Sequence, residues 1–183
     1  MTTSFLKAEE TVTFAQQFPN VHTAEVIAGE FGKNVNDVMD QSVLSCTEFD
    51  LEQKGLADVT GIDVFTNLQY LNLSSNQITS ILESIGKLSD LQILNLLDNQ
   101  LTNVPESIGN LTGLIGIDLS NNHLSVLPLS LIKLQSINEY LNLSNQTISL
   151  LPKDFITQSF TLTSSITAMG EVVPHLLAEQ VIV

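Results

Sequence analysis

The strongest constraint on the fold is a segment that recurs three times in the middle of the chain. Its copies begin at Leu68, Leu91 and Leu114, so the period is 23 residues (91 − 68 and 114 − 91). Each copy has an aliphatic residue three and five positions after its start and an asparagine eight positions after it. A fixed period of this length predicts a solenoid, in which each repeat stacks on the next one.

The full pattern is the signature of a leucine-rich repeat. The second copy is Leu91-x-x-Leu94-x-Leu96-x-x-Asn99-x-Leu101-x-x-Val104-Pro105. Because side chains alternate along a strand, Leu94 and Leu96 would point to one face, and a strand this short cannot bury that face alone. Successive copies would therefore stack into a parallel sheet over a continuous core. The predicted fold class is α/β, a leucine-rich-repeat solenoid with a short parallel sheet on its concave face.

The repeated asparagines have a predicted structural role where the chain leaves each strand. Their amides would stack as a ladder that satisfies the backbone groups of buried turns. The ladder consists of Asn76, Asn99 and Asn122. Weaker flanking copies, starting at Cys46 and Asn138, carry Lys54 and Gln146 at this position. Since terminal repeats are often atypical, we count about five repeats, three of them complete.

Both ends of such a stack expose core and need covers. Residues 18–45 form the expected helical N-terminal cap, in which Asn20 caps a helix that runs to about Phe31 and stops at Gly32. The apolar face of this helix would consist of Val21, Ala24, Ile27, Ala28 and Phe31. A shorter helical piece is expected over about 36–44. We assign residues 1–17 to an irregular leader, 46–155 to the repeats and 156–183 to a C-terminal cover.

The cap resembles a narrower family. The stretches 18–38 and 51–62 are similar to the helical cap and first repeat of internalin-type surface proteins of Gram-positive bacteria. This resemblance, over roughly residues 18–155, implies secretion or cell-wall attachment and adhesion to host proteins. The stretch 145–150 is similar to the opening strand of the immunoglobulin-like domain that follows internalin repeats, which makes 156–183 a candidate remnant of that domain.

Two features of the chain keep an intracellular alternative open. The central repeats are slightly longer than those typical of internalins, and they carry Val104-Pro105 and Leu127-Pro128. This style resembles intracellular signalling leucine-rich repeats, so a cytoplasmic scaffold or regulatory protein is the alternative. Met1–Glu10 has no basic start followed by an apolar run, so no signal peptide is expected and an exported form would be a trimmed one.

Charge narrows the class of partner. The chain has 6 lysines and arginines, all of them lysine, against 20 acidic residues, for a net charge of −14. Nucleic acids and anionic membranes attract clustered cations, so neither is an expected partner, and no membrane insertion is expected. A protein with a basic or neutral surface remains, and the chain itself is expected to be a monomer.

No residues point to catalysis. His22, His123 and His175 are scattered, and none lies at ligand spacing from another metal-binding residue. The single cysteine, Cys46, excludes an intrachain disulfide, and its place at the first apolar position of a repeat indicates a buried, inert thiol. The sequence therefore predicts no enzyme, no cofactor and no metal.

The variable strand positions are the candidate binding residues. Side chains that alternate with the core leucines face the concave surface and form three columns. The middle column is Asp50, Asn72, Asn95, Asp118 and Asn142. The second is Glu48, Tyr70, Ile93, Gly116 and Tyr140. The third is Glu52, Ser74, Leu97, Ser120 and Ser144. No lysine or arginine occurs in any of them.

The second column predicts an interaction site. On adjacent strands Tyr70, Ile93, Gly116 and Tyr140 would form one row about 14 Å long, with a notch at Gly116 and with Leu97 adding an apolar group. Apolar side chains in a polar, acidic surround are typical of interaction hot spots. The expected function is protein recognition or adhesion through the concave face. The alternatives are a structural spacer, and a generic polar sheet face that binds nothing in particular.

Overall fold

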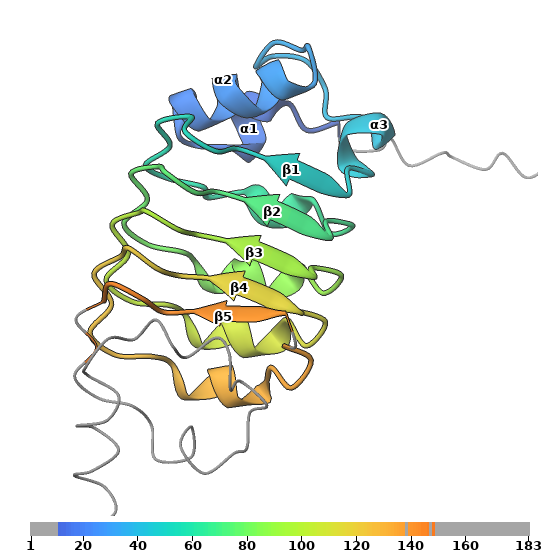
Figure 1. The fold of residues 1–183 in the computed structure, drawn as a ribbon. Helices are drawn as coiled ribbons and strands as arrows, with labels where there is room; N and C mark the ends of the chain where they lie inside the picture. The colour runs from blue at the N-terminus through green and yellow to red at the C-terminus, as the bar shows by residue number, and fades with distance from the viewer. Residues whose placement is uncertain (1–10, 138, 147, 149–183) are drawn as a thin grey trace, which may run out of the picture.

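The computed structural model describes residues 11–137, 139–146 and 148. Five strands form one parallel sheet in the order β1-β2-β3-β4-β5, and Figure 1 shows them stacked one beneath another. The strands are β1 (Glu48–Asp50), β2 (Tyr70–Asn72), β3 (Ile93–Asn95), β4 (Gly116–Asp118) and β5 (Tyr140–Asn142). Each strand pairs with the next one along the chain, as a solenoid requires. The predicted leucine-rich-repeat fold is confirmed.

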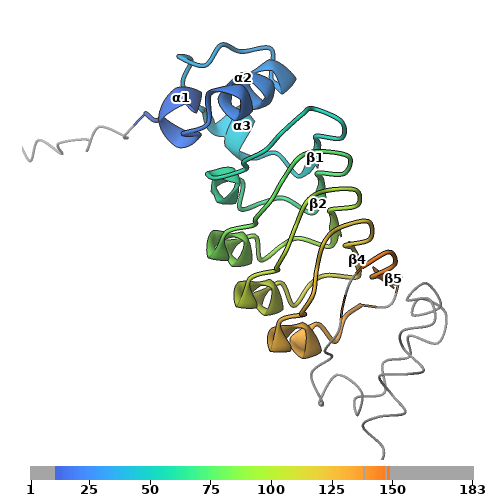
Figure 2. The same ribbon diagram turned by 90° about the vertical axis from the view of Figure 1, so that its left-hand side faces the viewer.

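Short 3₁₀ turns cover the side opposite the strands (Figure 2). They are η1 (Ile62–Val64), η2 (Glu83–Lys87), η3 (Glu106–Asn110) and η4 (Leu129–Lys133). Each of the last three buries one aliphatic side chain at the same position, namely Ile85, Ile108 and Leu131. Each of the first four repeats is therefore one strand and one turn that share a core.

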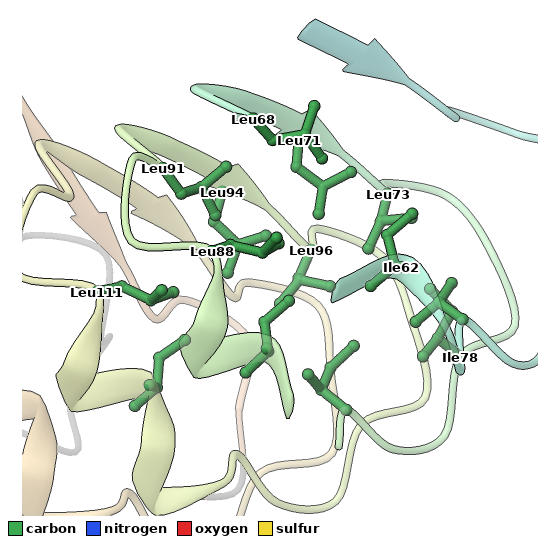
Figure 3. Packing of buried hydrophobic residues seen from close by; sticks show 14 of the residues in the cluster. Ile62, Leu68, Leu71, Leu73, Ile78, Leu88, Leu91, Leu94, Leu96 and Leu111 are labelled. Carbon is green, nitrogen blue, oxygen red and sulfur yellow. The ribbon is translucent and has the colours of Figure 1, made fainter. Parts of the chain in front are cut away.

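The core is a continuous stack of aliphatic side chains (Figure 3). Leu71 and Leu73 of one repeat and Leu94 and Leu96 of the next point inward from the sheet and are buried. Burial of one such side chain stabilises a fold by roughly 1.5–3 kcal/mol. Between the fourth and fifth repeats the strand pairing aligns Ile117 with Leu141, 24 residues apart (141 − 117), which agrees with a fifth repeat counted from Asn138. The buried Ile137 lies one position before that start.

Two glycines let neighbouring 3₁₀ turns approach closely. A Cβ atom on Gly109 would lie 2.5 Å from the Cβ atom of Ser130 and 2.6 Å from its carbonyl oxygen. A Cβ atom on Gly86 would lie 2.7 Å from the carbonyl oxygen of Ser107. Neither glycine has a positive φ. The backbone would therefore accept another residue at both positions, and glycine is needed because there is no room for a side chain.

Gly109→Ala is expected to destabilise the fold by about 1–3 kcal/mol, because the added methyl group must push two turns apart. The matched control is Gly113→Ala, since a Cβ atom there would lie 3.5 Å from its nearest neighbour, the Leu91 carbonyl oxygen, in ordinary contact. Urea denaturation of both variants measures the difference. Equal midpoints would show that the turns can separate without cost.

Three helices cap the β1 end of the stack (Figure 1): α1 (Phe14–Gln17), α2 (Val21–Glu30) and α3 (Gln41–Leu44). As predicted, Asn20 caps α2, and its side chain accepts a hydrogen bond of 3.0 Å from the Thr23 N–H. The expected apolar face is wrong at one position. Val21 is 70% exposed, and Thr23 is buried with its hydroxyl donating to the Asp58 carbonyl oxygen. The first residue of the helix thus lies off the buried face.

The expected irregular leader already contains part of the cap. Thr13 and Gln16 form a capping box, in which the Thr13 hydroxyl accepts from the Gln16 N–H and the Gln16 side chain accepts from the Thr13 N–H. This box starts α1, whose Phe14 is fully buried. The shorter helical piece begins later than expected, at Gln41, where Asp40 caps α3. Residues 1–10 and the expected cover 156–183 lie outside the described residues.

Phenylalanine rings join the cap to the first repeat. The Phe31 ring centroid lies 5.6 Å from that of Phe49 and 6.1 Å from that of Phe65. Phe14 and Phe18 extend the cluster, each 6.2 Å from one of these rings. Phe31, which follows α2 directly, therefore packs on Phe49 of the first repeat. Aromatic pairs of this kind add roughly 0.5–1.5 kcal/mol each beyond their buried area.

Candidate binding surface

The turns that hold the sheet in place depend on the asparagine ladder. Asn99 is 5% exposed. Its Oδ1 accepts from the Ile78 N–H at 3.0 Å, and its Nδ2 donates to the carbonyl oxygens of Leu73 at 2.9 Å and Leu96 at 3.2 Å. Asn76 and Asn122 make equivalent bonds. Each asparagine therefore satisfies its own turn and the turn of the preceding repeat.

This arrangement explains why the first and last repeats have another residue in place of the ladder asparagine, Lys54 in the first and Gln146 in the last. Gln146 replaces asparagine and keeps the role, because its Oε1 accepts from the Leu124 N–H at 2.9 Å and its Nε2 donates to the Leu119 carbonyl oxygen. Lys54 lies in the first repeat, which has no preceding repeat to satisfy. Its ammonium instead pairs with Glu30 of α2 at 2.7 Å, and its carbonyl oxygen accepts from His22 Nε2 at 2.8 Å.

A second polar network lies on the outward side of the sheet, which we call the sheet face. Each middle-column side chain accepts a hydrogen bond from the N–H two residues later. Their oxygens lie 2.8–3.2 Å from the nitrogens of Glu52, Ser74, Leu97, Ser120 and Ser144. Asn72 also donates to Asp50 at 3.0 Å, and Asn142 donates to Asp118 at 2.9 Å. Much of the middle column is thus committed to the fold, and Asn72 is only 5% exposed.

The second column has the geometry of a continuous row. Strand pairing aligns Tyr70 with Ile93, Ile93 with Gly116, and Gly116 with Tyr140. The side chains of Tyr70, Ile93 and Tyr140 are half-buried, as is that of Leu97 beyond β3. These residues come together as the sequence pattern predicted.

The predicted notch at Gly116 is wrong. A Cβ atom on Gly116 would lie 2.7 Å from the Tyr140 ring and 3.0 Å from Ile93 Cδ1. The ring and the aliphatic chain therefore lean over the glycine from both sides and bury it. Gly116 acts as the floor on which its neighbours meet, so the row is a closed apolar surface and not a cleft.

Both tyrosines of the row are held in their neutral form. Burial raises the pKa of Tyr70, and the nearby carboxylates of Asp50 and Glu52 raise it further. Burial also raises the pKa of Tyr140, followed by the effects of Asp118 and Tyr70. A tyrosine hydroxyl is already protonated at neutral pH, and these shifts keep the row uncharged at more alkaline pH as well.

Acidic side chains gather at one end of the sheet face. Glu48, Asp50 and Glu52 project outward from β1 and are exposed. Beside them lies an open hollow of about 500 Å³, lined by Glu30, Asp50, Glu52, Gln53 and Lys54. Lys54, which also lines the hollow, forms its ion pair with Glu30 and lies near enough to Asp50 for their charges to interact.

The other chemically active side chains have ordinary environments. Cys46 is half-buried, its thiol donates to the Glu48 carbonyl oxygen at 3.0 Å, and burial raises its pKa, which favours the unreactive thiol. His123 is exposed, and His175 lies outside the described residues. Within the described part of the chain, no group of three histidine, cysteine or acidic residues could hold a metal ion. The helices described there include none long and apolar enough to cross a membrane.

Comparison with known families agrees with the repeat geometry. A family model described as a leucine-rich repeat region matches residues 41–163. The chain belongs to the leucine-rich-repeat family. Leucine-rich-repeat domains mediate protein–protein interactions. A comparison with curated proteins found no match.

Solved structures similar to this leucine-rich-repeat chain include internalins. An internalin (InlF) of Listeria monocytogenes is 28% identical, with a TM-score of 0.63 over 79% of this chain and 48% of the internalin. A leucine-rich-repeat protein of Leptospira interrogans is 28% identical, with a TM-score of 0.59 over 62% of this chain and 29% of that protein. The functional domain of InlJ from Listeria monocytogenes, 22% identical with a TM-score of 0.51 over 80% and 41% of the two chains, shares the fold. The resemblance to internalins is confirmed, and the chain spans about half the length of the internalin InlF.

Proposed function

We propose that this chain is a non-enzymatic protein-recognition module whose sheet face binds a protein partner. The observation that carries the proposal is the row of Tyr70, Ile93 and Tyr140, three half-buried side chains in one register, with Gly116 between Ile93 and Tyr140. Tyrosine and large aliphatic residues surrounded by polar groups are typical of the centres of protein interfaces. The absence of lysine and arginine from the three columns leaves this surface free of positive charge.

The polar network favours a protein over a carbohydrate. A sugar is recognised through directional hydrogen bonds to free amides and carboxylates, whereas the middle column uses many of its groups to bond to its own turns. The sheet face instead has an apolar row in its middle and negative charge at its β1 end. A protein surface can complement both, with apolar side chains against the row and basic side chains against the carboxylates.

Similarity to internalins supports a secreted or cell-surface location and a role in adhesion. The Val104-Pro105 and Leu127-Pro128 pairs support an intracellular scaffold as the alternative. A structural spacer is a further alternative, and it predicts a sheet face that tolerates substitution. Binding measurements on sheet-face variants therefore separate recognition from spacing.

The double substitution Tyr70→Ala and Ile93→Ser is expected to weaken binding to a protein captured by the wild-type chain by at least about 100-fold, since each hot-spot side chain contributes about 2 kcal/mol or more. The melting temperature should shift less than for a core substitution, because neither side chain belongs to the buried core. The matched control is Leu82→Ser with Leu129→Ser, two apolar side chains that are each 47% exposed on the 3₁₀ side. Equal affinity of the sheet-face variant and the wild type would contradict the proposal.

A further inference from the structure

Charge is distributed unevenly over the sheet face. Both outward positions of β1, Glu48 and Asp50, and the next outward position after the strand, Glu52, are acidic, and we call these three the β1 carboxylates. The corresponding positions of β2 to β5 contain one carboxylate, Asp118. The two oxygens of Asp118 bond to Ser120 and Asn142. The sheet face therefore has an acidic end at β1 and a neutral, apolar middle.

No lysine among the described residues forms an ion pair with Glu48, Asp50 or Glu52, although Lys54 lies near enough to Asp50 for the two charges to interact. The three ion pairs found there join Lys54 to Glu30, Lys33 to Asp40 and Lys87 to Asp63. One oxygen of Asp50 accepts from the Glu52 N–H and from Asn72. Glu48 and Glu52 have no ion-pair partner in this part of the chain. An acidic surface that served solubility alone would not need to concentrate on one strand of the sheet face.

Tyr70 links the acidic end to the apolar row. It lies beside β1, paired in register with Glu48, and the carboxylates of Asp50 and Glu52 are close enough to raise its pKa. An aromatic ring next to carboxylates attracts a cation through both groups, and arginine can stack on the ring while it bonds to the carboxylates. The surface on this side of Ile93 is therefore suited to a basic side chain.

We propose that the partner is a basic protein segment that runs across the strands of the sheet face. It places lysine or arginine on Glu48, Asp50 and Glu52, and an apolar side chain on Ile93. This inference rests on the proposed function and adds the chemistry and direction of the ligand. Two strand spacings separate β1 from β3, so the basic and apolar groups lie about 10 Å apart, or about three residues in an extended segment.

A random linear peptide library displayed on phage supplies the probe. Peptides selected on the full chain are tested for binding to three variants. The first is Tyr70→Ala with Ile93→Ser. The second, Glu48→Gln, Asp50→Asn and Glu52→Gln, removes three charges and keeps the oxygen that accepts from the Glu52 N–H. The third is a matched control, Glu25→Gln, Asp90→Asn and Asp98→Asn, which removes three exposed charges away from the three columns.

Peptides that depend on Tyr70 and Ile93 should be enriched in lysine or arginine about three residues from a large apolar residue. The triple change on β1 should weaken their binding at least about tenfold and reduce its dependence on salt, because charge pairing supplies part of the affinity. The control should bind like the wild type. Row-dependent peptides that lack basic residues, or that bind the β1 variant unchanged, would overturn this inference and leave the proposed function standing. If no selected peptide depends on Tyr70 and Ile93, both fail.

Discussion

Asn99→Ala is expected to lower the free energy of unfolding by about 3 kcal/mol or more, because each buried polar group left unsatisfied costs about 1–3 kcal/mol. The alanine would leave the Ile78 N–H and the carbonyl oxygens of Leu73 and Leu96 without their side-chain partner. These groups belong to two successive repeats. Loss of the amide therefore weakens the contact between repeats as well as the turn itself.

Urea denaturation followed by circular dichroism measures this loss. The neighbouring variant Gln100→Ala removes an exposed side chain and should be close to neutral. Lys54→Ala, at the same repeat position as Asn99, should also be close to neutral, because it removes only a surface ion pair. Three equal denaturation midpoints would mean that the ladder does not hold the repeats together.

Removal of residues 1–44 is expected to cause aggregation of the chain. The deletion strips α1 to α3 from the first repeat and exposes Phe49 and Phe65, which are 4% and 0% exposed in the whole chain. Repeat stacks need polar terminal covers to stay soluble, because an open end presents core to water. The expected effect is the loss of soluble monomer, not a modest drop in stability.

Size-exclusion chromatography with light scattering detects this outcome. Point variants within the cap provide a graded version of the test. Phe31→Ala removes the ring that meets both Phe49 and Phe65 and should destabilise by about 3–5 kcal/mol. Val21→Ala on the exposed side of α2 should have little effect. A soluble, monomeric and fully folded deletion would contradict the role of the cap.

The stack itself is predictable from the sequence, because period and polarity leave few alternatives. Leucines two apart fix the inward side of each strand, and matching that pattern from copy to copy, at spacings of 22 to 24 residues, fixes which residues align across the sheet. The row of Tyr70, Ile93 and Tyr140 follows directly from that register. The helical cap follows from its Asn20 cap, its apolar periodicity and Gly32, which has a φ of 64°.

Other features depend on contacts that the pattern does not specify. A glycine on a strand predicts a gap, but the Tyr140 ring leans over Gly116 and closes it. Polar residues in the middle column look available for a partner, yet a side chain two residues from a backbone N–H can equally bond to its own turn. The position of α1 was within reach of the sequence, since Thr13 and Gln16 have the spacing of a capping box.

The most direct test of the central claim, that the sheet face is where a partner binds, is photocrosslinking from two positions. A photoreactive phenylalanine derivative replaces Tyr70 on the sheet face in one variant and Leu129 on the 3₁₀ side in another. Tyr70 is half-buried in the row, whereas Leu129 begins η4 and is 47% exposed. With a peptide selected on the wild-type chain, the structure predicts a crosslink from position 70 and none from position 129. Crosslinking from position 129 alone would place the binding surface on the opposite side and contradict the account.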